Sequence, residues 1–204
     1  MSNKINLQDQ IKKFFKFITL GQLGAGKTSF LVRITHDIYK ENFLPKLGFN
    51  FEIRNFQVDD QIVQLQIWDT AGLEISQFYI PRLYVNGKNG IFLIFDISDA
   101  SSFNSIQAWH KKALEEIEIL NLDCSFLLVG CKCDQESLRQ VPFYVAYSYA
   151  DEVGISYIET SAKSNINCLE AAKYLSKLCL NKTNENQKKK SIQLTNKKNF
   201  FYCY

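Results

Sequence analysis

Residues 14–39 read FFKFITLGQLGAGKTSFLVRITHDIY, and this stretch decides the fold. An apolar run typical of a buried strand (14–21) leads directly into a glycine-rich loop, and residues 27–39 have the apolar spacing of a helix. The loop, residues 21–28, matches GxxxxGK[ST] in the strand–loop–helix context that this motif needs. Such a loop surrounds phosphate oxygens with backbone N–H groups at the N-terminus of a helix. The sequence therefore predicts a phosphate-binding loop rather than a glycine-rich turn that only connects two elements.

The side chains of this loop and of one later strand end predict a nucleotide with Mg²⁺. Lys27 is expected to reach the β- and γ-phosphates, and the Thr28 hydroxyl is expected to ligate Mg²⁺. A second metal ligand is expected from a carboxylate at the end of a neighbouring strand, where Asp69 stands. Gly72 lets the next backbone N–H approach a γ-phosphate. The predicted nucleotide-binding residues of the loop are Gly21, Leu23, Gly24, Ala25, Gly26, Lys27, Thr28 and Ser29.

Two further short motifs indicate which base is bound. Lys132, Cys133 and Asp134 close an apolar run, and Ser161-Ala162-Lys163 follows the last predicted strand. Ligands of α/β folds bind at the carboxyl ends of parallel strands. A carboxylate there accepts hydrogen bonds from N1–H and the N2 amino group of guanine, a donor pair that adenine lacks. We therefore predict that Asp134 selects guanine. A P-loop kinase of small molecules is disfavoured, because the sequence shows no arginine-rich lid.

The rest of the chain alternates between strand-like and helix-like segments. This order predicts an α/β domain with a largely parallel sheet. Residues 49–58 and 62–69 each alternate with period two across the turn Asp59-Asp60-Gln61, which predicts an antiparallel hairpin. The other expected strands are 90–98, 125–134 and 155–158, and the other expected helices are 101–120, 137–150 and 165–181.

Charge divides the chain into a body and a tail. The 204 residues are 46% hydrophobic and 22% charged, which fits one globular domain. The net charge is +3, but residues 182–204 hold six lysines and one acidic residue, so the body is slightly acidic. We expect a body of residues 14–181 and a flexible, polar tail of residues 182–204. Such a tail suits an anionic membrane surface, and the body's charge argues against nucleic-acid binding.

The cysteines and the absence of long apolar runs indicate a cytoplasmic protein. Six cysteines occur without a CxxC pair and without a metal-type histidine spacing. Reduced thiols in a cytosolic protein are the expected state. The first 17 residues lack the apolar core of a signal peptide, and no stretch of 18 apolar residues occurs.

Taken together, these motifs resemble a small GTPase of the Ras superfamily over about residues 14–180. LGFNFEI (47–53) is similar to the Rab stretch IGVDF, and QLQIWDTAGLE (64–74) is similar to Rab KLQIWDTAGQE. The spacing of GIFLIFDISDASSFNSIQAW (90–109) also follows Rab. The resemblance implies a P-loop small G domain of the α/β class. Its sheet would have six strands, mostly parallel with one antiparallel, flanked by five helices.

The same resemblance implies ligands and partners. GTP or GDP and Mg²⁺ would be bound, with Tyr39 stacked on the guanine ring. Residues 37–50 and 70–86 would be the switch regions that meet effector, exchange-factor and activating proteins. The implied role is a GTP/GDP switch in vesicle traffic, associated peripherally with the cytoplasmic face of endomembranes. The aromatic residues Phe49, Phe51 and Trp68 form either an effector-binding patch or plain core.

Four residues depart from the family pattern at working positions. Leu73 stands where the family has the Gln that orients the attacking water. Leu23 replaces a Gly or small residue and is expected to crowd the space for that water and for an arginine finger. Lys46 replaces the Mg²⁺-ligating Thr of switch I. Cys131 replaces the Asn of the NKxD motif, and a thiol is a poor hydrogen-bonding group.

Two alternatives follow from these departures. Either each change is tolerated, or the protein binds GTP and hydrolyses it slowly or not at all. We favour slow hydrolysis, because Leu23 and Leu73 both act on the same water. A guanine-nucleotide-bound interaction module that does not hydrolyse, a pseudo-GTPase, is the further alternative. At the C-terminus, Cys203 matches neither a CaaX box nor a cysteine pair, so a lipidated and an unmodified thiol both stay open.

Overall fold

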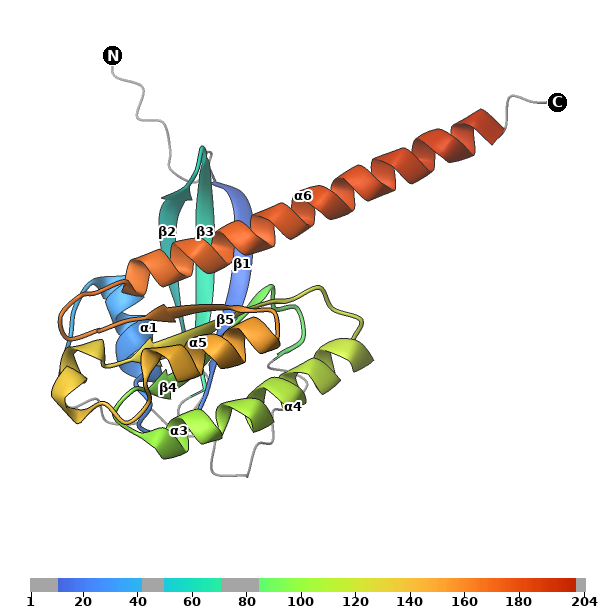
Figure 1. Cartoon of the computed structure of the whole chain (residues 1–204). Coiled ribbons are helices and arrows are strands. Elements are labelled where there is room, and N and C mark those ends of the chain that lie inside the picture. The colour runs from blue at the N-terminus through green and yellow to red at the C-terminus, as the bar shows by residue number, and fades with distance from the viewer. Residues whose placement is uncertain (1–10, 42–49, 71–84, 201–204) are drawn as a thin grey trace, which may run out of the picture.

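The structure is a computed structural model that describes residues 11–41, 50–70 and 85–200, with side chains described for 13–41, 51–70 and 85–186. Six strands form one sheet in the order β2-β3-β1-β4-β5-β6 (Figure 1). The strands are β1 (Ile11–Leu20), β2 (Asn50–Val58), β3 (Gln61–Asp69), β4 (Gly90–Asp96), β5 (Ser125–Cys131) and β6 (Ser156–Glu159).

Strand pairing confirms the predicted sheet. β1 pairs in parallel with both β3 and β4, and β5 pairs in parallel with β4 and β6. Only β2 runs antiparallel among these strands, joined to β3 by the predicted hairpin. The turn places Asp59 in the left-handed region with φ 50°, a conformation that Asp tolerates better than most residues. Every residue of β4 and of β5 is buried, which agrees with their nearly unbroken apolar sequences.

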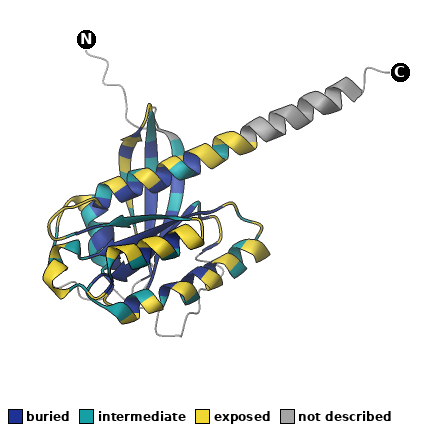
Figure 2. Cartoon of the chain, viewed as in Figure 1, coloured by how far each residue is buried: buried dark blue, intermediate teal, exposed yellow. Residues whose placement is uncertain are grey.

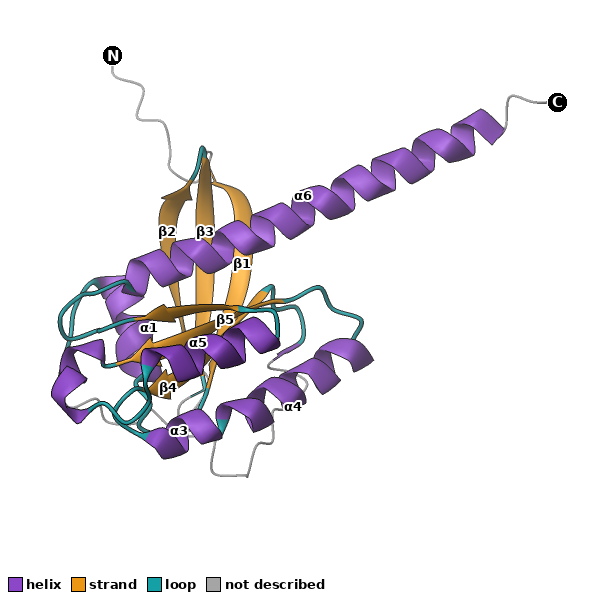
Figure 3. Cartoon of the chain, in the orientation of Figure 1, coloured by secondary structure: helices purple, strands orange, loops and turns teal. Residues whose placement is uncertain are grey.

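Helices cover both faces of the sheet (Figure 3). α1 (Lys27–His36) and α6 (Cys168–Phe200) pack on one face, and α4 (Ile106–Ile119) and α5 (Phe143–Glu152) pack on the other. The short α3 (Ala100–Asn104) precedes α4, and a 3-10 helix spans Cys133–Leu138. These five α-helices of the described segments complete the predicted α/β small G domain.

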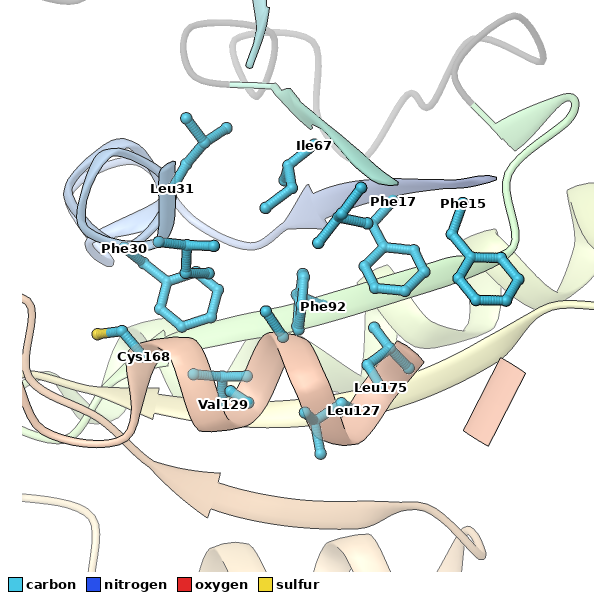
Figure 4. Close-up of a cluster of buried hydrophobic side chains, with 14 of the residues drawn as sticks. Phe15, Phe17, Phe30, Leu31, Ile67, Phe92, Leu127, Val129, Cys168 and Leu175 are labelled. Atoms are coloured by element: carbon cyan, nitrogen blue, oxygen red, sulfur yellow. The ribbon is translucent and has the colours of Figure 1, made fainter. Parts of the chain in front are cut away.

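Two apolar cores, one on each face, hold the helices to the sheet (Figure 2). Figure 4 shows part of the core under α1 and α6. There Phe92 of β4 contacts Phe17 of β1 and Phe30 of α1 edge to face, with ring centroids 5.6 Å and 5.2 Å apart. Edge-to-face packing suits the ring quadrupoles. These rings hold α1, the helix that begins at the phosphate loop, against the central strands.

Two helices begin or end where the sequence pattern did not predict. The single helix expected over 101–120 is two helices that meet at Ser105, whose hydroxyl donates to the carbonyl of Ser102 at 2.7 Å. Such side-chain bonds to nearby carbonyls compete with helical geometry. The helix expected over 137–150 begins instead at Phe143, directly after Pro142, and the residues before it form the 3-10 helix.

The C-terminal helix is longer than predicted. We expected it to end near residue 181, but α6 continues to Phe200. Residues 182–200 contain no Gly or Pro, and so nothing in their backbone chemistry stops a helix. Contacts with the body also continue past 181: Lys182 Nζ donates to the Cys124 carbonyl at 2.8 Å, and Asn186 Nδ2 to Asp123 Oδ2 at 2.7 Å. The division into a body of residues 14–181 and a flexible tail of residues 182–204 stays a prediction.

Among the described residues, every helix is too short or too polar to cross a membrane.

Candidate nucleotide-binding site

The phosphate loop joins β1 to α1 and depends on glycine at two places. A Cβ at Gly21 would lie 2.0 Å from the carbonyl oxygen of Ile94, so the loop passes too close to β4 for a side chain. Gly26 takes a left-handed conformation with φ 102° as it caps α1. Only glycine adopts such geometry without strain. The loop therefore curls tightly before the helix, as a phosphate loop must if its backbone N–H groups are to face a phosphate.

Lys27 and Thr28, the last two residues of the loop motif, form the first turn of α1. Lys27 is buried, and its Nζ donates to the carbonyl oxygens of Gly21 at 2.8 Å and Gln22 at 2.9 Å. The lysine charge therefore lies inside the curl of the loop. Thr28 Oγ1 donates to Asp69 Oδ2 at 2.6 Å. The two predicted metal ligands, one from α1 and one from the end of β3, thus lie next to each other.

Threonine hydroxyls fix the strand end that carries Asp69. Thr70 Oγ1 donates to the Thr19 carbonyl at 2.6 Å, and Thr19 Oγ1 donates to the Trp68 carbonyl at 3.4 Å. Both threonines are buried. The bonds hold the end of β3 beside β1, so the carboxylate of Asp69 has a defined position relative to the phosphate loop. Neither threonine could be assigned this role from the sequence, because each bonds a strand that lies beside its own only in the folded sheet.

A small pocket opens beside the phosphate loop. It is formed by the loop's last glycine, the first turn of α1, the segment that follows α1, the end of β5 with the residues after it, and the segment after β6. Almost all of its lining residues are ones that the sequence assigned to nucleotide binding. They are Gly26, Ser29, Tyr39, Cys131, Lys132, Asp134, Gln135, Ala162 and Lys163. The structure therefore brings together the three separate base-binding segments that the sequence predicted.

Hydrogen bonds orient the polar groups around this pocket. Ser161, fully buried, donates its hydroxyl to Asp134 Oδ1 at 2.5 Å and accepts the backbone N–H of Ser164 at 2.9 Å. Lys132 Nζ forms an ion pair with Asp96 Oδ2 at 2.5 Å. Asp96 ends β4, and sequence reasoning missed it. The rule that found Asp69 and Asp134, a carboxylate at the end of a buried strand, also applies to Asp96.

Cys131 lies at the bottom of the pocket, against the phosphate loop. Its Sγ is 3.6 Å from Thr160 Oγ1 and 3.6 Å from the point where a Cβ at Gly26 would stand. Burial raises the pKa of the Cys131 thiol to about 12. The side chain is therefore neutral near pH 7 and fills space under the loop, and its contact with the Thr160 hydroxyl is a weak hydrogen bond because a thiol is a poor donor and acceptor.

The residues expected to govern hydrolysis divide between described and undescribed segments. Leu23 lies on the phosphate loop with 59% of its surface exposed. Lys46, Gly72 and Leu73 lie outside the described residues, as do Phe49 and most of the segments 37–50 and 70–86. Two of the three aromatic residues proposed as a patch do meet. Phe51, 42% exposed, packs on Trp68 with ring centroids 4.9 Å apart.

Comparisons with known proteins agree with this geometry. A profile of the Ras family matches residues 16–181. The chain is 40% identical over 166 residues to the GTP-binding protein YPTM1 of Zea mays, which covers 81% of this chain and 77% of the relative. It is 39% identical over 158 residues to the Ras-related protein RABD2a of Arabidopsis thaliana, covering 77% of this chain and 75% of the relative. It is 36% identical over 156 residues to the GTP-binding protein ypt2 of Schizosaccharomyces pombe, covering 76% of each chain.

Proposed function

This chain belongs to the Ras family and is a Rab-like small GTPase, and from that membership we propose that it binds GTP and GDP with Mg²⁺ as a switch in vesicle traffic. The observation that carries the proposal is the convergence of four separate chain segments on one site. The phosphate loop, Asp69, the segment around Asp134 and the segment around Ser161 meet at the ends of neighbouring strands. A binding site for a nucleotide in a parallel sheet requires this arrangement.

The metal-binding residues fit Mg²⁺. Mg²⁺ prefers oxygen ligands and is held by one or two protein groups together with phosphate oxygens and waters. The Thr28 hydroxyl and the Asp69 carboxylate supply two such oxygens, 2.6 Å apart. When bound, the ion would neutralise charge on the β- and γ-phosphates. The Thr28 hydroxyl would hold the ion through an oxygen lone pair, which its donation to Asp69 leaves free, and Asp69 would supply carboxylate oxygen beside it.

The base-binding residues fit guanine. The Asp134 carboxylate lies at the pocket with Ser161 bonded to one of its oxygens. Its remaining acceptor sites suit the N1–H and N2 donors of guanine, which adenine does not present. Tyr39, on another wall of the same pocket, would stack on the ring. Lys132, whose ammonium is paired with Asp96, would line the pocket with its carbon chain.

We further propose that GTP hydrolysis is slow. In this family, catalysis consists of positioning and electrostatics, and a Gln orients the attacking water. Leu73 stands at that position and offers neither a donor nor an acceptor. Leu23 extends from the phosphate loop where a small residue would leave room for an arginine finger. Both changes lower the rate of hydrolysis and leave the phosphate-binding groups in place. The Rab-like membership also supports peripheral association with endomembranes, to which the basic tail would contribute.

Nucleotide binding is the direct test. Purified full-length chain, stripped of nucleotide and titrated with fluorescent GDP, GTP and ATP in the presence of Mg²⁺, should bind both guanine nucleotides and not ATP. Lys27→Ala should abolish binding, because it removes the buried charge inside the loop. Lys163→Ala, at the rim of the base pocket, is the milder comparison and should weaken binding without removing it. Tight binding of ATP by the native chain would show that Asp134 does not select guanine.

A further inference from the structure

An open edge of the sheet, remote from the nucleotide pocket, has a groove beside it. β6 is the last strand in the sheet order, so no described strand pairs with its outer edge. A groove of about 540 Å³ lies beside this edge and is lined by residues of α5, β6 and α6. It has no lining residue in common with the nucleotide pocket. The side chains that make the groove aromatic, apolar and acidic are Tyr147, Asp151, Tyr157, Ile158, Glu170 and Tyr174.

Aromatic rings from three elements line this groove. Tyr147 of α5 is 55% exposed and Tyr174 of α6 is 44% exposed. The Tyr174 hydroxyl and the Ser156 Oγ are 2.8 Å apart, which ties that ring to the start of β6. Phe143, also exposed, stacks beside Tyr147 with ring centroids 6.1 Å apart, and so extends the aromatic surface along α5. Rings gathered on a solvent-facing surface mark an interaction site rather than a core.

The charge of the groove is negative and uncompensated. Asp151 stands on the α5 wall and Glu170 on the α6 wall. Among the described residues, neither carboxylate forms a side-chain hydrogen bond or an ion pair, and no lysine or arginine lines the groove. Carboxylates beside exposed aromatic faces attract a guanidinium or ammonium group by ion pairing and by cation–π contact. The groove is therefore complementary to a basic side chain.

The open strand edge indicates the form of the occupant. An unpaired edge accepts an extended segment through main-chain hydrogen bonds, and side-chain pockets beside it give specificity. Asn167 Nδ2 donates to the Glu159 carbonyl at 3.0 Å and closes the far end of β6. The accessible part of the edge is therefore Ser156–Ile158, directly between the two acidic walls. We propose that this groove binds an extended segment of a partner protein, with a lysine or arginine side chain placed between Asp151 and Glu170.

The test is an NMR titration of the full-length, nucleotide-loaded, ¹⁵N-labelled chain with two synthetic peptides. One peptide is acetyl-Thr-Val-Thr-Lys-Thr-Val-Thr-amide, and the other replaces its lysine with glutamine. The lysine peptide should shift amide signals of β6 and of the flanking turns of α5 and α6. The glutamine peptide should bind roughly ten-fold more weakly, as expected for losing a charge-assisted contact.

Matched variants separate the groove from the general surface. Asp151→Asn combined with Glu170→Gln should remove the preference for lysine, whereas Glu152→Gln, the exposed neighbour outside the groove, should leave it unchanged. Tyr147→Ala should weaken binding, and Tyr144→Ala, a more exposed ring outside the groove, should not. Amide shifts that are absent at millimolar peptide, or equal for both peptides, would overturn the proposal. Concentration-dependent dimerisation in sedimentation with shifts at β6 would also overturn it, because a second copy would then cover the groove.

Discussion

At the scale of single residues, the hydroxyl of Ser161 orients the carboxylate of Asp134, for which we propose guanine binding. It donates to Asp134 Oδ1 at 2.5 Å from a fully buried position and is itself held by the Ser164 N–H. A hydroxyl that is locked in this way keeps one carboxylate oxygen occupied and turns the rest of the group toward the pocket. The orientation of Asp134 is therefore a property of the segment that follows β6.

Ser161→Ala should speed the release of guanine nucleotide. Loss of one hydrogen bond to a charged group costs about 1.5–3 kcal/mol, which corresponds to a roughly 10- to 150-fold faster dissociation of fluorescent GDP measured by stopped flow. Ser164→Ala is the control, since Ser164 contributes only its backbone N–H to the same hydroxyl. An unchanged dissociation rate in Ser161→Ala would show that Asp134 does not depend on this bond.

Leu73 and Leu23 should separate GTP binding from GTP hydrolysis. Single-turnover phosphate release from preloaded GTP should be slower than in an ordinary Rab-like protein and should respond little to an arginine-finger activator. Leu73→Gln should raise the rate only partly, because Leu23 and Lys46 remain. Leu23→Gly together with Leu73→Gln should do more than either change alone. Native release as fast as in an ordinary family member would mean that another residue positions the water.

At the scale of elements, the strands were predictable because the spacing of apolar residues in each strand indicates which of its faces are buried. A strand covered on both faces, such as β4, has no polar alternation, and its continuous apolar run identified it. Helix ends were less predictable. The break at Ser105 depends on a side-chain hydrogen bond that an amphipathic pattern does not contain. The start of α5 after Pro142 carried a local signal, because proline fits the beginning of a helix far better than its interior.

The candidate site divides in the same way. Lys27, Thr28, Asp69 and Asp134 stand in motifs whose order along the chain is informative, and the sequence named them all. Asp96 also stands at the end of a buried strand, but its ion pair with Lys132, which directly follows β5, could not be read from the sequence. The two meet through the parallel register in which Asp96 pairs with Cys131. Sequence motifs report local chemistry, whereas a contact between strand ends is a consequence of sheet order.

The basic end of α6 should bind anionic membranes. Lys188, Lys189 and Lys190 lie in the described helix, and each lysine near an anionic surface contributes about 1 kcal/mol. Full-length chain should co-sediment with vesicles containing phosphatidylserine and not with neutral vesicles, and added salt should weaken the binding. Replacing these three lysines with glutamine should weaken it as well. Binding that is indifferent to both salt and the substitution would reject an electrostatic contact.

A peptide of residues 182–204 tests the predicted flexibility of the tail separately. Free in solution, it should give the circular dichroism of a disordered chain, because a short helix without tertiary packing is marginal in water. Strong helicity without vesicles would contradict the division of the chain at residue 181.

At the scale of the whole molecule, the sheet separates two apolar cores, and both contain cysteine thiols. Cys131 and Cys179 belong to the core under α1 and α6, and Cys124 belongs to the opposite core. Burial raises the pKa of each of these thiols to about 12. Unfolding would expose them to water, where a thiol ionises near pH 8.5. The folded state therefore holds protons that the unfolded state releases at alkaline pH.

The free energy of unfolding should consequently be unaffected by these thiols below about pH 8.5 and fall as the pH rises toward 12. Each thiol contributes a slope of up to about 1.4 kcal/mol per pH unit within that window. Urea unfolding at pH 7.5, 9.5 and 10.5 should show a steeper loss in the native chain than in a Cys124→Ala, Cys131→Ala, Cys179→Ala variant. Lysine and tyrosine titrate in both proteins, so the difference isolates the thiols. An equal loss of unfolding free energy with pH in the two proteins would contradict the raised pKa values of these thiols.

The unbroken course of α6 has a mechanical consequence. Its 33 residues rise as a single rod of about 50 Å, and the part beyond residue 181 accounts for roughly 30 Å. A flexible tether, as predicted for residues 182–204, would let the nucleotide pocket point in any direction. The continuous helix of the structure would instead fix both the height and the orientation of the body above a surface that holds the far end of α6. One residue inserted into the projecting part would turn the body by about 100° around the rod's axis while lifting it only about 1.5 Å. The number of helical residues between the body and the surface would thus set the direction in which the nucleotide pocket faces.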